Sequence, residues 1–167
     1  NEIAVDVAYS LMFTEKLSGS VAFRYIRADL GNGIPSQEIY PGSAVSADVA
    51  AYYRTPIALQ NTEGTLAFGA NISNIGSKVS YDKKVTSSFL PTNMRLGASF
   101  DYPIDDYNKI SVSTDINKLL VPTPKLNPTT EDLQAYSDMS PLAGIFNSFG
   151  DAPGGFKEEM REWTMGI

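Results

Sequence analysis

Four acidic residues near the C-terminal end of the chain have the types and spacing that could do chemistry: Asp151, Glu158, Glu159 and Glu162. Carboxylates at this density could bind a divalent cation, or could act as the acid and base of a hydrolase. The alternating ligands of an EF-hand loop are missing, and the spacing gives no further support for paired-carboxylate catalysis. We therefore interpret these residues as a solvated helix face and predict no metal site.

Composition removes most other routes to catalysis. The sequence contains no cysteine and no histidine, which excludes thiolate nucleophiles, disulfides, Ser-His pairs and the commonest zinc ligand. Residues 150–155 are rich in glycine but lack the Lys-Ser/Thr of a phosphate-binding loop. The net charge is −6 and no stripe of Lys and Arg is present, so nucleic acid is not expected as a partner. We expect a protein that is not an enzyme and that uses no cofactor.

A second group of charged residues recurs at alternate positions of strand-like segments. Apolar and polar residues alternate with a period of two, which is typical of β-strands, and 163–167 begin a similar pattern. The full segments are residues 3–13, 20–26, 45–54, 66–73, 94–102 and 110–117. One face of each is apolar and uncharged. The opposite faces carry Ala, Ser, Gly and Asn together with the charged residues Asp6, Arg24, Asp48, Arg54, Arg95, Asp101 and Asp115.

These faces predict an antiparallel transmembrane β-barrel rather than a soluble β-sandwich, which is the alternative. Small polar side chains with charges of both signs suit a crowded, wet barrel interior, so we expect the charged residues to line the lumen. These residues could line a path for a substrate, or they could pair with one another and fill the lumen. Because both signs of charge are present, the second interpretation is favoured. The uncharged faces would then contact outer-membrane lipid. No run of 18 apolar residues is present, so no transmembrane helix is expected.

The connections between the segments alternate in length, as they do in outer-membrane barrels. Short connections are expected near residues 14–19, 55–64 and 103–109, and long ones near 27–44, 74–93 and 118–162. Aromatic residues gather near the short connections, as in an interfacial girdle. They are Phe13, Tyr53, Phe68, Phe100, Tyr102 and Tyr107. We expect residues 1–167 to be an internal part of one barrel domain, because both ends lie in strand-like patterns.

The last long connection, residues 118–162, is predicted to be an extracellular loop with short helices. Prolines should keep residues 120–128 extended. Thr130 could cap a helix over 131–138, Pro141 could open a second helix that ends at Gly150, and residues 156–162 could form a third. The second helix carries a candidate partner-binding patch, which could instead be a small core on the barrel rim. The patch comprises Leu142, Ile145, Phe146 and Phe149.

Three segments resemble one protein family. They are residues 74–81 (NIGSKVSY), 89–97 (FLPTNMRLG) and 115–124 (DINKLLVPTP), and the last is the most specific. Together they resemble the PorV (LptO) family of outer-membrane proteins, which serves type IX secretion in Bacteroidota and falls within the FadL-like barrel superfamily. The resemblance covers nearly the whole chain. It implies a barrel of about 14 strands, of which six or seven are present here.

The resemblance also implies a function and partners. Members bind the C-terminal signal domains of secreted cargo at the large translocon barrel and deliver them to the cell-surface sortase, with their outer loops facing the cell exterior. The alternative within the superfamily is a FadL-like channel for hydrophobic small molecules, although the small polar residues expected in the lumen argue against an apolar pocket.

Overall fold

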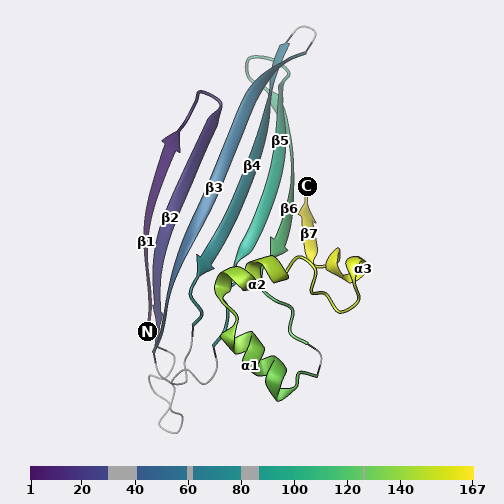
Figure 1. Cartoon of the computed structure of the whole chain (residues 1–167). Helices are drawn as coiled ribbons and strands as arrows, with labels where there is room; N and C mark the ends of the chain where they lie inside the picture. The colour runs from purple at the N-terminus through teal and green to yellow at the C-terminus, as the bar shows by residue number, and fades with distance from the viewer. Residues whose placement is uncertain (30–40, 60–61, 80–86, 126) are drawn as a thin grey trace.

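The computed structural model describes residues 1–29, 41–59, 62–79, 87–125 and 127–167. Seven strands and three short helices make up the described part of the fold (Figure 1). The strands are β1 (Glu2–Met12), β2 (Leu17–Ala28), β3 (Gly42–Leu59), β4 (Thr62–Gly76), β5 (Asn93–Pro103), β6 (Lys109–Leu119) and β7 (Trp163–Gly166). The helices are α1 (Thr130–Asp138), α2 (Pro141–Asn147) and α3 (Phe156–Glu159).

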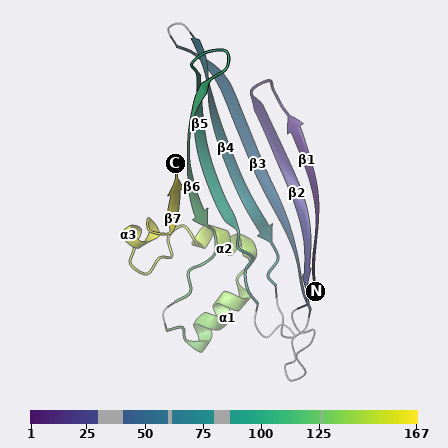
Figure 2. The same ribbon diagram turned by 180° about the vertical axis from the view of Figure 1, so that it is seen from behind.

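All seven strands form one antiparallel sheet in which each strand pairs with the next along the chain. This confirms the six predicted strands and the partial seventh, and it agrees with an all-β fold. Seen from either side, the strands lie next to one another as a single curved layer, and α1 and α2 lie beyond one end of it (Figures 1 and 2). None of the helices in the described parts of the chain has the length and hydropathy needed to cross a bilayer.

The strand register places the apolar faces of the strands on the same side of the sheet. Val7 of β1 lies opposite Phe23 of β2, and Phe23 lies opposite Ala47 of β3. Leu96 of β5 lies opposite Ala70 on one side and Ile116 on the other. A one-residue slip in any pair would move a whole apolar set to the polar side, so the aligned faces explain the register.

The apolar side of the sheet is exposed in the described structure. The side chains of Val7 and Phe23 are 68% and 65% exposed, and Val49 and Val112 are about half exposed. All of the described strands belong to the one sheet, so no second sheet packs on this side. The exposed side is therefore a contiguous apolar surface across several strands, which in a protein marks a site of contact with a partner or a membrane.

The connections follow the predicted alternation in length. Consecutive strands are antiparallel, so the connections β1–β2, β3–β4 and β5–β6 meet at one end of the sheet and the longer connections meet at the other (Figure 1). The central parts of two predicted long connections, residues 30–40 and 80–86, lie outside the described residues, as do residues 60–61 and 126.

The short connection predicted near 55–64 is present but shorter than predicted, because β3 continues to Leu59 and β4 starts at Thr62. Pro56 lies in this extension of β3 and pairs with Thr65 inside the ladder. The backbone N–H of Arg54 donates to the carbonyl oxygen of Lys16, which comes just before β2. The nitrogen of Pro56, two residues on, points to the same edge of β3, where β2 no longer lies beside it. Proline is tolerated in a strand where its nitrogen needs no hydrogen-bond partner.

The three predicted helices are present with shifted ends. The N-cap of α1 is Thr129 rather than Thr130, since its hydroxyl accepts from the amide of Asp132 in a capping box. Ser140 caps α2, which starts at Pro141 as predicted and ends at Asn147, so Phe149 lies beyond it. Helix α3 spans Phe156–Glu159 only, shorter than the predicted 156–162.

Candidate functional site

An apolar groove lies between the described residues of segment 122–128, which leave out residue 126, and helices α1 and α2. Its volume is about 610 Å³. Pro122 and Pro124 form one wall, and Leu133, Tyr136 and Met139 of α1 form the other. The prolines hold the first wall extended, and the capping box fixes the start of the second. A groove of this size and lining can hold apolar side chains of a bound polypeptide or a small ligand.

Helix α1 is held against the β4–β5 connection by a lysine and an aromatic ring. The ammonium of Lys78 donates to the carbonyl oxygens of Tyr136 and Ser137 at 2.7 and 2.8 Å. The rings of Phe89 and Tyr136 meet edge to face, with centroids 5.0 Å apart. Burial lowers the pKa of Lys78 below its ordinary value. The wall formed by α1 is therefore anchored to the β4–β5 connection at two places, Lys78 and Phe89.

The mouth of the groove carries an ion pair. Lys125 Nζ lies 2.5 Å from Asp132 Oδ1, and Asp132 also accepts from Thr129. The bond from Lys125, followed by the bonds from Thr129, lowers the pKa of Asp132 from 3.8 to about 2. This carboxylate therefore stays charged at neutral pH and keeps the start of α1 next to segment 122–128.

The structure divides the predicted partner-binding patch in two. Leu142 and Phe146 lie one turn apart on α2 and are 61% and 75% exposed. Ile145 is half-buried, and Phe149 lies beyond the helix. The ring centroid of Phe149 is 5.9 Å from the ammonium of Lys118, so this ring covers a buried charge. Whether the patch binds a partner remains a prediction.

Helix α2 packs closely on the extended segment. A Cβ added to Gly144 would lie 2.8 Å from Phe89 and 3.2 Å from Pro122, both side-chain contacts. Ser148 is buried, and its hydroxyl donates to the carbonyl oxygen of Ile145. The buried face of α2 therefore carries small residues, while its large apolar residues Leu142 and Phe146 stay outside.

A buried lysine holds the last connection to the end of β6. The Lys118 side chain has no exposed surface, although it continues the apolar face of the strand. Its ammonium donates to Glu159 Oε1 and, at 3.0 Å, to Glu162 Oε2. The Trp163 ring centroid lies 5.8 Å from the same nitrogen. Sequence reasoning missed Lys118, although a lysine in phase with an apolar face was a usable signal.

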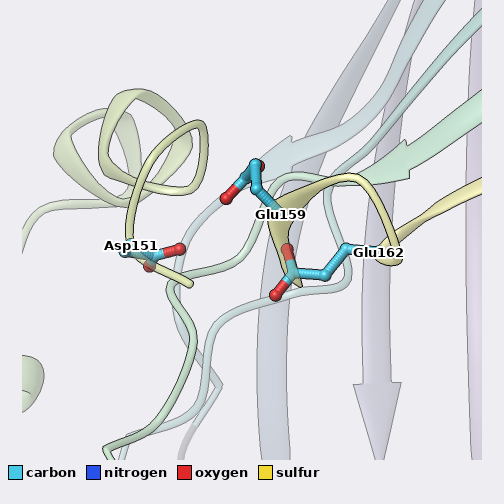
Figure 3. Close-up of side chains that lie close together, drawn as sticks. All are labelled: Asp151, Glu159 and Glu162. Carbon is cyan, nitrogen blue, oxygen red and sulfur yellow. The ribbon is translucent and has the colours of Figure 1, made fainter. Parts of the chain in front are cut away.

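Asp151 joins these carboxylates, so residues from three places in the last connection converge (Figure 3). The backbone amide of Thr123 donates to Asp151 Oδ2 at 2.7 Å. The prediction of a solvated helix face is wrong for Glu159, which is 7% exposed, and for the half-buried Glu162. Lys118 is the reason, because its charge draws both carboxylates inward. Glu158 is exposed, as expected.

The charged residues predicted to line the lumen all lie on the polar side of the sheet by register. Arg24 Nε lies 2.6 Å from Asp6, and another nitrogen of Arg24 lies 3.9 Å from Asp48. On the same side, Arg95 lies 3.9 Å from Asp115, Asp101 lies 3.5 Å from Lys109, and Arg54 is opposite Ala67. Neighbouring strands thus bring opposite charges together; a lumen around them remains a prediction.

Asn74 links this charged network to the end of the sheet. It has a left-handed backbone, with φ of 58°, at the place where the β3–β4 register shifts. Its backbone N–H donates to the carboxylate of Asp48 at 2.7 Å, and its side-chain oxygen accepts from Arg24 at 3.0 Å. A Cβ on Gly76 would collide with the backbone of β3. The sequence Asn-Ile-Gly at residues 74–76 is therefore explained by the fold: Asn74 takes the left-handed backbone, and Gly76 lets β4 approach β3 closely.

One comparison with known proteins relates most of the chain to a family. The chain matches the family model described as type IX secretion system protein PorV over residues 1–126. This range includes β1 to β6 and the motif that carries Lys118 and Thr123, whereas α1 to α3 and β7 lie outside it. Comparison with the curated proteins gave no match. The chain therefore belongs to the PorV family of type IX secretion system proteins.

Proposed function

We propose that the sheet is an arc of a FadL-like β-barrel in the bacterial outer membrane, with its apolar side in lipid and its polar side in the lumen. The exposed apolar side supports this proposal, because strands with uncharged outer positions are what a barrel presents to hydrocarbon. Alternating connection lengths support it as well. The long connections would then face the cell exterior.

Within this barrel, we propose that the last connection binds the C-terminal signal domains of secreted cargo. The protein would take these domains from the large translocon barrel and deliver them to the cell-surface sortase. Membership of the type IX secretion family supports the role, and the exposed apolar residues of α2 carry the choice of site. Leu142 and Phe146 are exposed apolar residues in a polar connection, as expected of anchors for a protein partner.

The double variant Leu142→Ser, Phe146→Ser in the full protein is expected to weaken binding of a purified signal domain by about tenfold or more. Both side chains are more than half exposed, so the variant should keep its fold. Biolayer interferometry with the barrel in detergent measures the dissociation constant. Heat-modifiable mobility on a gel reports that the barrel is intact.

Phe156→Ser provides the matched control. Phe156 is 81% exposed in the same connection but belongs to α3, outside the predicted patch. Its loss is expected to leave the dissociation constant unchanged within about twofold, since a surface aromatic away from the binding site contributes little. Equal binding by the wild type and the α2 double variant would reject this site for cargo.

We do not extend the proposal to a channel for hydrophobic molecules. The polar side of the sheet carries acidic and basic residues joined in pairs, such as Arg24 with Asp6. A hollow of about 420 Å³ on this side is lined mostly by small and polar residues, such as Gly69, Gly97 and Ser113, although Tyr52, Phe68 and Ile167 also border it. Pockets for apolar ligands are lined mainly by hydrophobic and aromatic residues.

A further inference from the structure

We propose that Asp151, Glu159 and Glu162, with the hydroxyl of Thr123, form a binding site for a divalent cation of the Ca²⁺ type. One oxygen from each carboxylate lies within 4.8 Å of the others, and the three side chains point toward a common space (Figure 3). A Ca²⁺ ion binds oxygens at about 2.4 Å, so two ligands on opposite sides of it are about 4.8 Å apart. All three carboxylates can therefore reach one ion.

The hydrogen bonds of the cluster leave oxygen atoms for a cation. Lys118 uses Glu159 Oε1 and Glu162 Oε2. The hydroxyl of Thr123 lies 3.0 Å from Asp151 Oδ1 and 3.2 Å from Glu162 Oε1, yet it has one proton to donate. One of those two oxygens therefore lacks a donor from Thr123 whichever way the hydroxyl turns.

Glu159 gives the independent observation that points to a ligand. The residue is 7% exposed, and its Oε2 atom is buried without a hydrogen-bond partner among the described residues. A buried carboxylate oxygen without a partner is costly, and native structures normally satisfy such atoms with protein, water or an ion. Oε1 of the same carboxylate already accepts from Lys118, so Oε2 is the oxygen that needs a cation or a hydrogen-bond donor.

The charge of the cluster favours a divalent ion. Three ionised carboxylates surround one ammonium, which leaves a net charge of −2 in a partly buried space. A divalent cation neutralises this charge, whereas lysine alone cannot. The donor set contains only carboxylate and hydroxyl oxygens, which hard cations such as Ca²⁺ prefer over the softer transition metals. This site does not depend on the protein-binding role proposed above.

Terbium luminescence tests the site, because Trp163 lies beside it and can transfer energy to bound Tb³⁺. In the full protein in detergent, we expect sensitised emission that added Ca²⁺ displaces. Glu162→Gln and Asp151→Asn are each expected to weaken Ca²⁺ binding by about tenfold or more. Trp163→Phe should lose the Tb³⁺ emission that Trp163 sensitises. Calorimetry should show that this variant still binds Ca²⁺.

Glu158→Gln is the matched control, since Glu158 is an exposed carboxylate in the same short helix. It should bind Ca²⁺ like the wild type. Glu162→Gln is the decisive variant, because its side chain is 31% exposed and its amide can still accept from Lys118. Folded wild-type protein without Ca²⁺-displaceable emission would overturn the proposal. An equal loss in Glu158→Gln and Glu162→Gln would overturn it too.

Discussion

Replacing Val7 with arginine is expected to lower the free energy of unfolding of the full protein in lipid vesicles by about 2–4 kcal/mol. Val7 lies at the middle of β1 on the exposed apolar side. A guanidinium at this position would be placed in hydrocarbon, where no counter-ion or water can solvate it. Denaturant unfolding followed by tryptophan fluorescence measures the change, and the amount of assembled protein in the outer membrane should fall with it.

Ala8→Arg is the matched control, because the next residue faces the opposite side of the sheet. Ala8 pairs with Ala22, which itself lies opposite Asp48, so an arginine here has acidic neighbours. We expect a change within about 0.5 kcal/mol, as for an ordinary exposed substitution. Similar losses for Val7→Arg and Ala8→Arg would mean that the two sides of β1 have the same surroundings, contrary to our account.

Replacing Lys118 with methionine is expected to destabilise the last connection by about 3–5 kcal/mol. Methionine keeps most of the length of the lysine but leaves the buried Glu159 without its counter-ion. The loss should appear as faster hydrogen exchange of the amides in residues 150–163. The measurement is made with EDTA present, so that no cation can replace the missing ammonium.

Lys125→Met separates burial from simple loss of charge. Lys125 also bonds a carboxylate, that of Asp132, but its side chain is 71% exposed. Exposed ion pairs contribute about 0–1 kcal/mol, so this variant should change exchange only slightly. The double variant Lys118→Met, Glu159→Gln should recover part of the loss, because it no longer buries an uncompensated charge. If Lys118→Met changed the hydrogen exchange of residues 150–163 as little as Lys125→Met does, the account would be contradicted.

The strands could be predicted because their signal is local. The alternation of residues such as Val5, Asp6 and Val7 records the side of the sheet on which each side chain lies. The register follows once every apolar face must share one side. The strand predicted over residues 45–54 ended too early, because β3 continues through Pro56 to Leu59. Proline breaks a strand only where the adjacent strand needs a hydrogen bond from its nitrogen. The pairing of β2 with β3 stops at Tyr53, so no such bond is needed at Pro56.

The helices and the site were harder to predict, because contacts distant in sequence decide them. Thr130 and Pro141 gave the starts of α1 and α2 to within a residue, but the sequence did not reveal the close packing of α2 on Phe89 and Pro122. Glu159 and Glu162 looked like a solvated helix face until the fold placed them on Lys118. The groove combines segment 122–128 with α1 and α2, and no spacing along the chain reveals such a cavity.

Lipid exposure of the apolar side of the sheet is the central claim, and nitroxide scanning along β1 tests it most directly. The chain has no cysteine, so single cysteines can be introduced at residues 3–12 and labelled one at a time. In lipid vesicles, collisions with oxygen, which concentrates in hydrocarbon, should peak at Ile3, Val5, Val7 and Tyr9. Collisions with a water-soluble nickel chelate should peak at the residues between them. Equal access of the chelate to both sets would contradict the account.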